Sequence, residues 1–251
     1  MVTESYDYQE VDKTMMYYGT PLLKESDFPF NFYLLDLPQN ISGWWAKHLV
    51  DLWMTNMPRG KWPNWVSASR DPERSPMQWN GDMNAGFNNK TNITWLPVHP
   101  DYQTVNVEAQ MKDEGSVLSQ YRSLNRLRQS ELPFQRGWFC YILADTNVFS
   151  YLRELDGHKR AYLMVINFGK QSATTDLSSI QEFPANLKVL MSTNPVNDGK
   201  LFQKSRILTE PGEGLMMQYS TYTRFHPNHP ADCFVSEKAC YMETIDILYK
   251  C

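Results

Sequence analysis

The chain has 251 residues, of which 42% are hydrophobic and 21% are charged, a composition typical of a globular protein with one large or two small domains. Its formal net charge of −4 argues against a nucleic-acid-binding surface, which would need a basic face. The apolar runs, such as residues 161–168, fall far short of the roughly 20 residues that span a bilayer, so no transmembrane segment is expected in this chain.

The first 66 residues predict alternating strands and helices. Residues 1–6, 28–35 and 62–66 have the short apolar pattern of strands. Between them, Asn40 is the predicted N-cap of an amphipathic helix that ends at Pro58 and Gly60. Its apolar face is formed by residues at spacings of three and four: Ile41, Trp44, Trp45, His48, Leu49, Leu52 and Trp53. This alternation indicates an α/β architecture.

Residues 69–113 are rich in Asn, Asp, Pro and Gly and predict a long irregular segment. Within it, Asp71, Glu73 and Arg74 form a loop of mixed charge, which fits either a substrate-facing loop or a solvated, salt-bridged one. A second helix is predicted over residues 116–129 and ends before Pro133. Its apolar positions lie on one face: Val117, Leu118, Tyr121, Leu124 and Leu127.

From Trp138 onward, short apolar or alternating runs recur at residues 147–155, 160–168, 187–191 and 214–219. Turn sequences separate them, such as Asp156-Gly157 and Asn197-Asp-Gly199. This pattern predicts an antiparallel sheet domain, with a boundary near residues 132–137.

The four cysteines lie in the last part of the chain, at Cys140, Cys233, Cys240 and Cys251. An even number confined to one region indicates disulfides formed in an oxidising compartment. Three glycosylation sequons, at Asn40, Asn89 and Asn92, point to the same environment.

A zinc site is the alternative for this region, because His226, His229, Cys233 and Cys240 fall within fifteen residues. Their spacing is not a standard one, and Pro227 and Pro230 stiffen the segment, so disulfides are the favoured interpretation. The sequence contains no Gly-rich phosphate loop, and we expect no metal and no cofactor.

Several motifs resemble glycoside hydrolase family 13, and in particular its maltases and oligo-1,6-glucosidases. The longest is Ser69-Arg-Asp-Pro-Glu-Arg-Ser-Pro-Met-Gln-Trp79, followed by Asn84-Ala-Gly-Phe87. Lys61-Trp-Pro-Asn-Trp65 resembles the seventh barrel strand of that family, and Asp12-Lys-Thr-Met-Met-Tyr-Tyr-Gly19 resembles the segment after the fifth.

Other segments resemble the heavy subunits of heteromeric amino-acid transporters, which are relatives of the α-glucosidases. These segments are Gly137-Trp-Phe-Cys140, Arg153-Glu-Leu-Asp-Gly157, Asn167-Phe-Gly169 and the tail from Cys233 through Cys240 to Cys251. The resemblance implies a partial (β/α)8 barrel followed by a C-terminal antiparallel β-sandwich. The implied domains are a barrel remnant (1–66), an irregular loop with the last barrel helix (67–132) and the sandwich (133–251).

Hydrolysis of glycosides requires two carboxylates on either side of the scissile bond. The resemblance puts the acid at Glu4 and the nucleophile upstream of Met1, and it puts a third carboxylate in an Asn-His-Asp motif that should follow Val66. The chain instead continues directly to Ser67, so the eighth strand is expected to be absent. We therefore expect a non-catalytic protein in which Glu4 is a relic; the alternative is a truncated α-glucosidase.

The resemblance also implies partners and modifications. A heavy subunit pairs with a light-chain exchanger of cystine and basic or neutral amino acids and lies at the extracellular side of the plasma membrane. Its anchor would lie upstream of this sequence. The implied disulfides are Cys140–Cys233 and Cys240–Cys251. Glycans are expected on Asn89 and Asn92 before Asn40, because an N-cap side chain would be occupied.

Overall fold

A computed structural model describes residues 2–3, 10–20, 23, 25–33, 41–58, 61, 63, 75–90 and 93–234. The chain forms two compact units, one made of residues 1–66 with 129–251 and the other of residues 67–128. Some predicted features lie outside the described residues: Glu4, Asn40, most of the strand at 62–66, Asp71, Glu73, Arg74, Asn92, Cys240 and Cys251.

The N-terminal segment contains one strand–helix–strand repeat. Strand β1 (Val2–Thr3) and strand β2 (Phe28–Pro29) pair in parallel, and helix α1 (Val11–Met16) lies between them in sequence. Parallel strands joined through a helix are the repeating unit of (β/α)8 barrels. This unit agrees with the predicted α/β architecture and with a partial barrel.

Helix α2 (Gly43–Asn56) confirms the predicted amphipathic helix, but the predicted N-cap is wrong. The cap is Ser42, whose Oγ accepts a hydrogen bond from the Trp45 backbone N–H at 3.1 Å. Ser42 satisfies one of the N–H groups that a helix start leaves without a partner, as Asn40 was expected to do. Of the helix tryptophans, Trp53 is fully buried and Trp44 is 59% exposed.

Trp53 is the centre of a small core between α1 and α2. Its ring meets the rings of Tyr18 and Tyr33 edge to face, with centroids 6.4 and 6.1 Å away. Met15 and Tyr18 of the α1 region are buried in the same cluster. Edge-to-face aromatic pairs of this kind stabilise a core beyond the area that they bury.

Helix α2 also packs against the C-terminal sheet. Its first residue, Gly43, lies so close to the Val148 carbonyl that an added Cβ would be 1.9 Å from the oxygen. The Trp44 backbone N–H donates to the Asp145 carbonyl at 3.0 Å, and Lys47 Nζ lies 4.2 Å from the centroid of the Tyr141 ring. The N-terminal residues therefore form one compact unit with the sheet.

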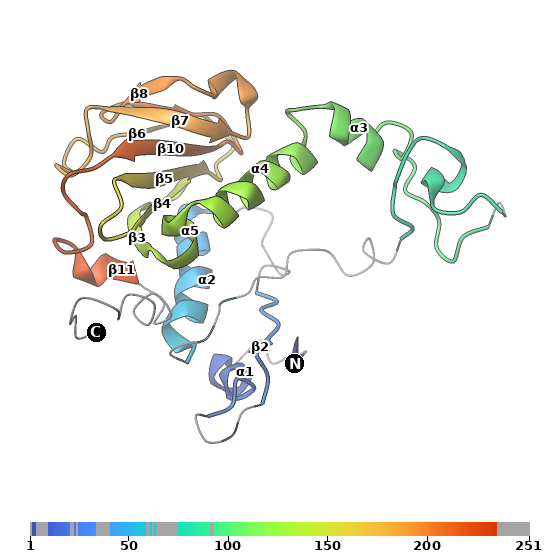
Figure 1. Cartoon of the computed structure of the whole chain (residues 1–251), viewed down its shortest axis with the longest axis horizontal. Coiled ribbons are helices and arrows are strands. Elements are labelled where there is room, and N and C mark those ends of the chain that lie inside the picture. The colour runs from blue at the N-terminus through green and yellow to red at the C-terminus, as the bar shows by residue number, and fades with distance from the viewer. Residues whose placement is uncertain are drawn as a thin grey trace. The chain divides into compact units, whose positions relative to one another are not determined.

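The C-terminal region contains a seven-stranded sheet in which every neighbouring pair is antiparallel (Figure 1). Its order is β11 (Cys233–Phe234), β3 (Trp138–Ala144), β4 (Val148–Glu154), β5 (Arg160–Asn167), β10 (Gly214–Ser220), β7 (Asn186–Ser192) and β8 (Leu201–Gln203). The predicted antiparallel sheet is confirmed, and the four predicted runs coincide with β4, β5, β7 and β10.

A second, two-stranded sheet pairs β6 (Ala173–Thr175) with β9 (Ile207–Thr209). Ile207 belongs to the same buried core as the residues of the large sheet. With only two described strands in this layer, the predicted two-sheet sandwich is not confirmed.

The large sheet is covered on both faces near its centre, so the middle strand β5 is apolar almost throughout. Alternate residues Ala161, Leu163 and Val165 are buried in the main core. The residues between them also lie buried: the Tyr162 ring centroid is 4.5 Å from that of Phe134, in helix α5 (Leu132–Arg136).

The second unit is largely irregular, as predicted. Its described elements are the turn η2 (Met83–Gly86) and helix α3 (Val107–Lys112), and helix α4 (Val117–Ser130) begins within it. Helix α4 confirms the predicted helix, but its apolar face is not buried: Val117 is 77% and Tyr121 66% exposed. Local capping accounts for the helix without a covered face, because Ser116 Oγ accepts the Ser119 N–H at 3.2 Å.

No helix in the described part of the chain combines the length and the apolar character that crossing a bilayer requires.

Candidate functional site

The glucosidase-like motif folds into a strained turn in the second unit. Asn84, Ala85 and Gly86 have φ angles of 52°, 56° and 69°, in the left-handed region that favours glycine. The backbone N–H groups of Trp79 and Asn80 both donate to the Ala85 carbonyl, at 2.9 and 3.2 Å. These bonds hold two non-glycine residues in a conformation that L-residues adopt uncommonly and that recurs at functional sites as well as in turns.

An open pocket adjoins this turn. Its lining is Asn80, Asp82, Met83, Gly86, Phe87, Asn88, Asn89 and Lys90. Asp82 is the one carboxylate among these lining residues, and its Oδ2 accepts a bond from Asn80 Nδ2 at 2.9 Å. The pocket therefore lacks, in the residues described, the facing pair of carboxylates that glycoside hydrolysis needs. Asn89 is exposed here, as a glycosylation acceptor must be.

A disulfide joins Cys140 of β3 to Cys233 of β11, with an S–S distance of 2.07 Å. The two residues lie directly opposite each other in the antiparallel pair, with Cα atoms 4.0 Å apart, and both are buried. This is the first of the two pairs that the heavy-subunit resemblance implies. Because the Cys233 sulfur is bonded to Cys140, it does not serve as a zinc ligand.

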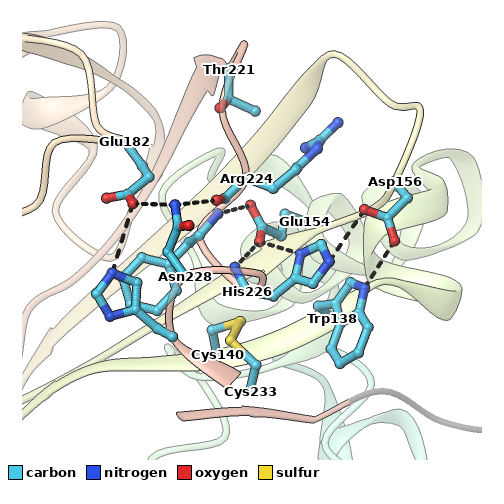
Figure 2. Close-up of polar contacts among 12 residues, drawn as sticks. Trp138, Cys140, Glu154, Asp156, Glu182, Thr221, Arg224, His226, Asn228 and Cys233 are labelled. Carbon is cyan, nitrogen blue, oxygen red and sulfur yellow. Dashed lines mark hydrogen bonds and ion pairs between the residues drawn. A yellow bond between two sulfur atoms is a disulfide. The ribbon is translucent and has the colours of Figure 1, made fainter. Parts of the chain in front are cut away.

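A cluster of polar side chains lies beside the disulfide (Figure 2). At its centre is Glu154, the last residue of β4, whose side chain is fully buried. Oε1 accepts the backbone N–H of His226 at 2.8 Å and lies 2.9 Å from His226 Nδ1. Oε2 accepts the backbone N–H of Phe225 at 3.2 Å. Glu154 thus binds the backbone of the segment 221–234, which contains Cys233.

The charge of Glu154 also acts on a neighbouring phenol. Burial, followed by the negative charge of Glu154, raises the pKa of Tyr219 well above its ordinary value. Tyr219 therefore stays neutral over the physiological pH range and packs in the main core, where its ring meets Phe183 edge to face.

The imidazole of His226 lies between two carboxylates and on an aromatic face. Its ring stacks on Trp138, with centroids 4.4 Å apart and planes 10° apart. Nε2 lies 3.4 Å from Asp156 Oδ1, and Asp156 Oδ2 accepts a bond from Trp138 Nε1 at 3.2 Å. These contacts make His226 a partner of carboxylates, whereas sequence reasoning had considered it as a zinc ligand.

A second histidine fixes the same segment. The ring of His229 stacks on Phe225 with centroids 4.0 Å apart, and its Nε2 lies 3.7 Å from Glu182 Oε1. Asn228 Nδ2 donates to the same oxygen at 2.9 Å. Although burial opposes the change, hydrogen bonds and the nearby charges of His229 and Lys204 lower the pKa of Glu182.

The cluster has the chemistry of a structural clamp. In the part of the chain that the structure describes, no group of three or more His, Cys, Asp and Glu side chains could hold a metal ion. Sequence reasoning did not assign roles to Trp138, Glu154 and Asp156. The signal that points to them is the heavy-subunit resemblance, since all three lie in its quoted segments.

Comparison with known proteins agrees with these observations. The model of the α-amylase catalytic domain matches residues 61–137. The human amino acid transporter heavy chain SLC3A1 is 34% identical over 305 aligned residues, covering 99% of this chain and 44% of the relative. The mouse heavy chain is also 34% identical, and the alignment covers 96% of this chain and 43% of the length of the mouse protein. An α-glucosidase of Culex pipiens is 29% identical, and the alignment covers 75% of this chain and 41% of the length of that enzyme.

Solved structures of carbohydrate-active enzymes share the fold. A trehalose-6-phosphate hydrolase of Bacillus licheniformis matches with a TM-score of 0.50 and 29% identity, covering 60% of this chain and 26% of that one. A mutant of the trehalulose synthase MutB matches with a TM-score of 0.51 and 26% identity, covering 59% of this chain and 26% of that one.

Residues 61–137 are therefore similar to the catalytic domain of the α-amylase family. Along nearly its whole length, the chain is a relative of the transporter heavy chain SLC3A1 (rBAT). The chain spans less than half the length of these heavy chains. The 305 aligned positions exceed its 251 residues, so the relative has internal residues without a counterpart here.

Proposed function

We propose that this chain is part of the glucosidase-like extracellular region of a heavy subunit of a heteromeric amino-acid transporter. In the full-length protein it would pair with a light-chain exchanger of cystine and basic or neutral amino acids, stabilise that exchanger and bring it to the plasma membrane. The observation that carries the proposal is the 34% identity to SLC3A1 over 99% of the chain.

The disulfide supports the heavy-subunit reading. Cys140–Cys233 is a pair that the heavy-subunit resemblance implies, and it fastens the segment that leads to the cysteine-containing tail. We propose Cys240–Cys251 as the second pair and a C-terminal β-sandwich, residues 133–251, built by the large sheet and the β6–β9 layer. Residues 1–66 and 67–132 would then be the remnant of the barrel and its last loop and helix.

We also propose that the protein is not a glycosidase. The sequence contains no Asn-His-Asp motif, so the carboxylate that family 13 enzymes carry in it has no counterpart here. The competing function is an α-glucosidase, which the α-amylase match and the 37% identity to maltase 1 of Drosophila virilis over 62% of the chain favour. Release of glucose from maltose by the purified chain, abolished in Glu4→Gln, would establish the competing function.

The heavy-subunit proposal is tested with a chimera. The aligned 44% of human SLC3A1 is replaced by this chain, and the chimera is expressed with a light-chain exchanger. The proposal expects the light chain to co-purify with the chimera. A second chimera that carries the matching segment of a maltase is the control. Recovery of the light chain no greater than with the maltase chimera would contradict the proposal.

A further inference from the structure

We propose that His226 is a pH-dependent latch, which holds the segment 221–234 against the sheet most firmly when its imidazole is protonated. The latch consists of His226, Glu154, Asp156 and Trp138 (Figure 2). It would be tight in mildly acidic solution and would loosen as the pH rises. The inference rests on the geometry of these four side chains and is independent of the proposed transport function.

Both ring nitrogens of His226 face carboxylate oxygens, Nδ1 at 2.9 Å from Glu154 and Nε2 at 3.4 Å from Asp156. An imidazolium carries a proton on each nitrogen and donates to both carboxylates. A neutral imidazole has one N–H, so its other nitrogen would present a lone pair to a negatively charged oxygen. Loss of the proton therefore removes one attractive contact and introduces a repulsive one.

The burial of Glu154 makes the contact with His226 more sensitive to the charge of the imidazole. Its side chain has no exposed surface, and a buried carboxylate is costly without a nearby positive charge. Among the described residues, His226 is the one cationic group with a nitrogen within 4.0 Å of Glu154. Removal of its proton leaves the buried charge with hydrogen bonds from two backbone N–H groups and one neutral ring nitrogen.

The stacked ring of Trp138 also attracts the protonated imidazole more than the neutral one. A cation over an aromatic face is attracted by the negative charge above the ring, and Trp is the most effective of the aromatic side chains. The stack of His226 on Trp138 has a centroid distance of 4.4 Å. Trp138 also donates to Asp156, so it holds the outer carboxylate beside the imidazole.

The other charged groups around the segment do not replace this arrangement. His229 and Lys204 both act on Glu182, and Glu182 Oε1 lies 3.7 Å from His229 Nε2. Arg224, in the same segment, forms no ion pair with Glu154 among the described residues, and its Nη1 is buried without a hydrogen-bond partner. Among the described residues, His226 is thus the basic side chain that contacts Glu154.

Opening of the latch would expose two amides directly. The N–H groups of Phe225 and His226 both donate to Glu154, so their hydrogen exchange reports whether the segment is held. The test compares their protection in the full chain, relative to an unfolded peptide at the same pH, at about pH 6 and about pH 8.5. These two pH values span the range in which histidine side chains change charge in proteins.

The proposal expects protection of these amides to fall roughly tenfold from the lower to the higher pH, the change that a hydrogen bond to a charged group produces. His226→Gln should show no such fall, whereas His158→Gln should keep it, because the His158 ring lies in a turn beside the backbone carbonyl and N–H of Arg160. An equal fall in His226→Gln, or none in the parent chain, would overturn the proposal.

If His226→Gln does not fold, a second variant tests the proposal by the same exchange measurement. Asp156→Asn removes the outer carboxylate of a side chain that is 56% exposed, so the fold should tolerate it. The proposal expects a smaller fall in protection between the two pH values than in the parent chain. A fall as large as that of the parent would show that His226 does not act through the pair of carboxylates.

Discussion

Removal of the Cys140–Cys233 disulfide should cost the unit that contains the large sheet a substantial part of its stability. The bridge joins residues 93 positions apart, and closing a loop of that length in the unfolded chain corresponds to about 4–5 kcal/mol at 25 °C in the chain-entropy model. A typical domain has a free energy of unfolding of roughly 5–15 kcal/mol. The double variant Cys140→Ala, Cys233→Ala should therefore unfold at a much lower urea concentration than the parent chain.

The assay is urea unfolding of the full chain followed by circular dichroism of the sheet. Both sulfurs are buried, so the variant also loses packing, and the reduced parent chain is the control that keeps both side chains. If the entropy argument holds, the reduced parent loses about 4–5 kcal/mol of unfolding free energy, and the double variant loses this amount and the lost packing of two buried side chains. A reduced parent that loses less than about 1 kcal/mol would refute the argument that the long loop makes this bridge stabilising.

Three further predictions follow from burial and exposure. Trp53→Ala should destabilise the chain by about 3–5 kcal/mol in urea unfolding, because Trp53 is fully buried, whereas Trp44→Ala, at a 59% exposed position, should change it by about 0.5 kcal/mol or less. Gly43→Ala should lower the melting temperature, because the new Cβ would clash with the Val148 carbonyl; an unchanged melting temperature would count against the docking of α2. In secreted material, Asn89→Gln should remove one glycan from the mass spectrum, and an unchanged mass would contradict the prediction.

The sequence predicted the antiparallel sheet well because local signals mark its strands. Gly157 and Gly199 have φ angles of 74° and 77°, which glycine adopts readily, and the turns that contain them separate the predicted runs. The three-residue strands β6, β8 and β9 carry too few residues for a period to emerge, so the pattern did not predict them.

The sequence predicted where helices α2 and α4 lie in the chain, but it did not predict the N-cap of α2 or the exposure of α4. Ser42 and Asn40 are both good N-caps, and the choice between them depends on where the chain enters the helix. The apolar spacing of α4 predicted that its apolar residues share one face, and two of them, Val117 and Tyr121, are exposed. Periodicity shows which residues share a face; whether another element covers that face depends on tertiary structure.

The resemblance indicated the disulfide pair and the segments that contain Trp138, Glu154 and Asp156, but it did not relate these side chains to His226. Glu154 and His226 are 72 residues apart, and no local pattern relates a strand end to a segment that returns beside it. The cluster forms because β11 pairs with β3, which places the segment before Cys233 next to the end of β4. Such contacts follow from topology, and the sequence contains no periodic signal for them.

If this chain acts as part of a transporter heavy subunit, the SLC3A1 chimera should support transport by its light chain. The decisive measurement is uptake of labelled cystine by cells that co-express a light-chain exchanger and the chimera. We expect uptake clearly above that of cells with the light chain alone and above that of cells with the maltase chimera. Uptake equal to that of the light chain alone, in cells that contain the folded chimera, would contradict the heavy-subunit role.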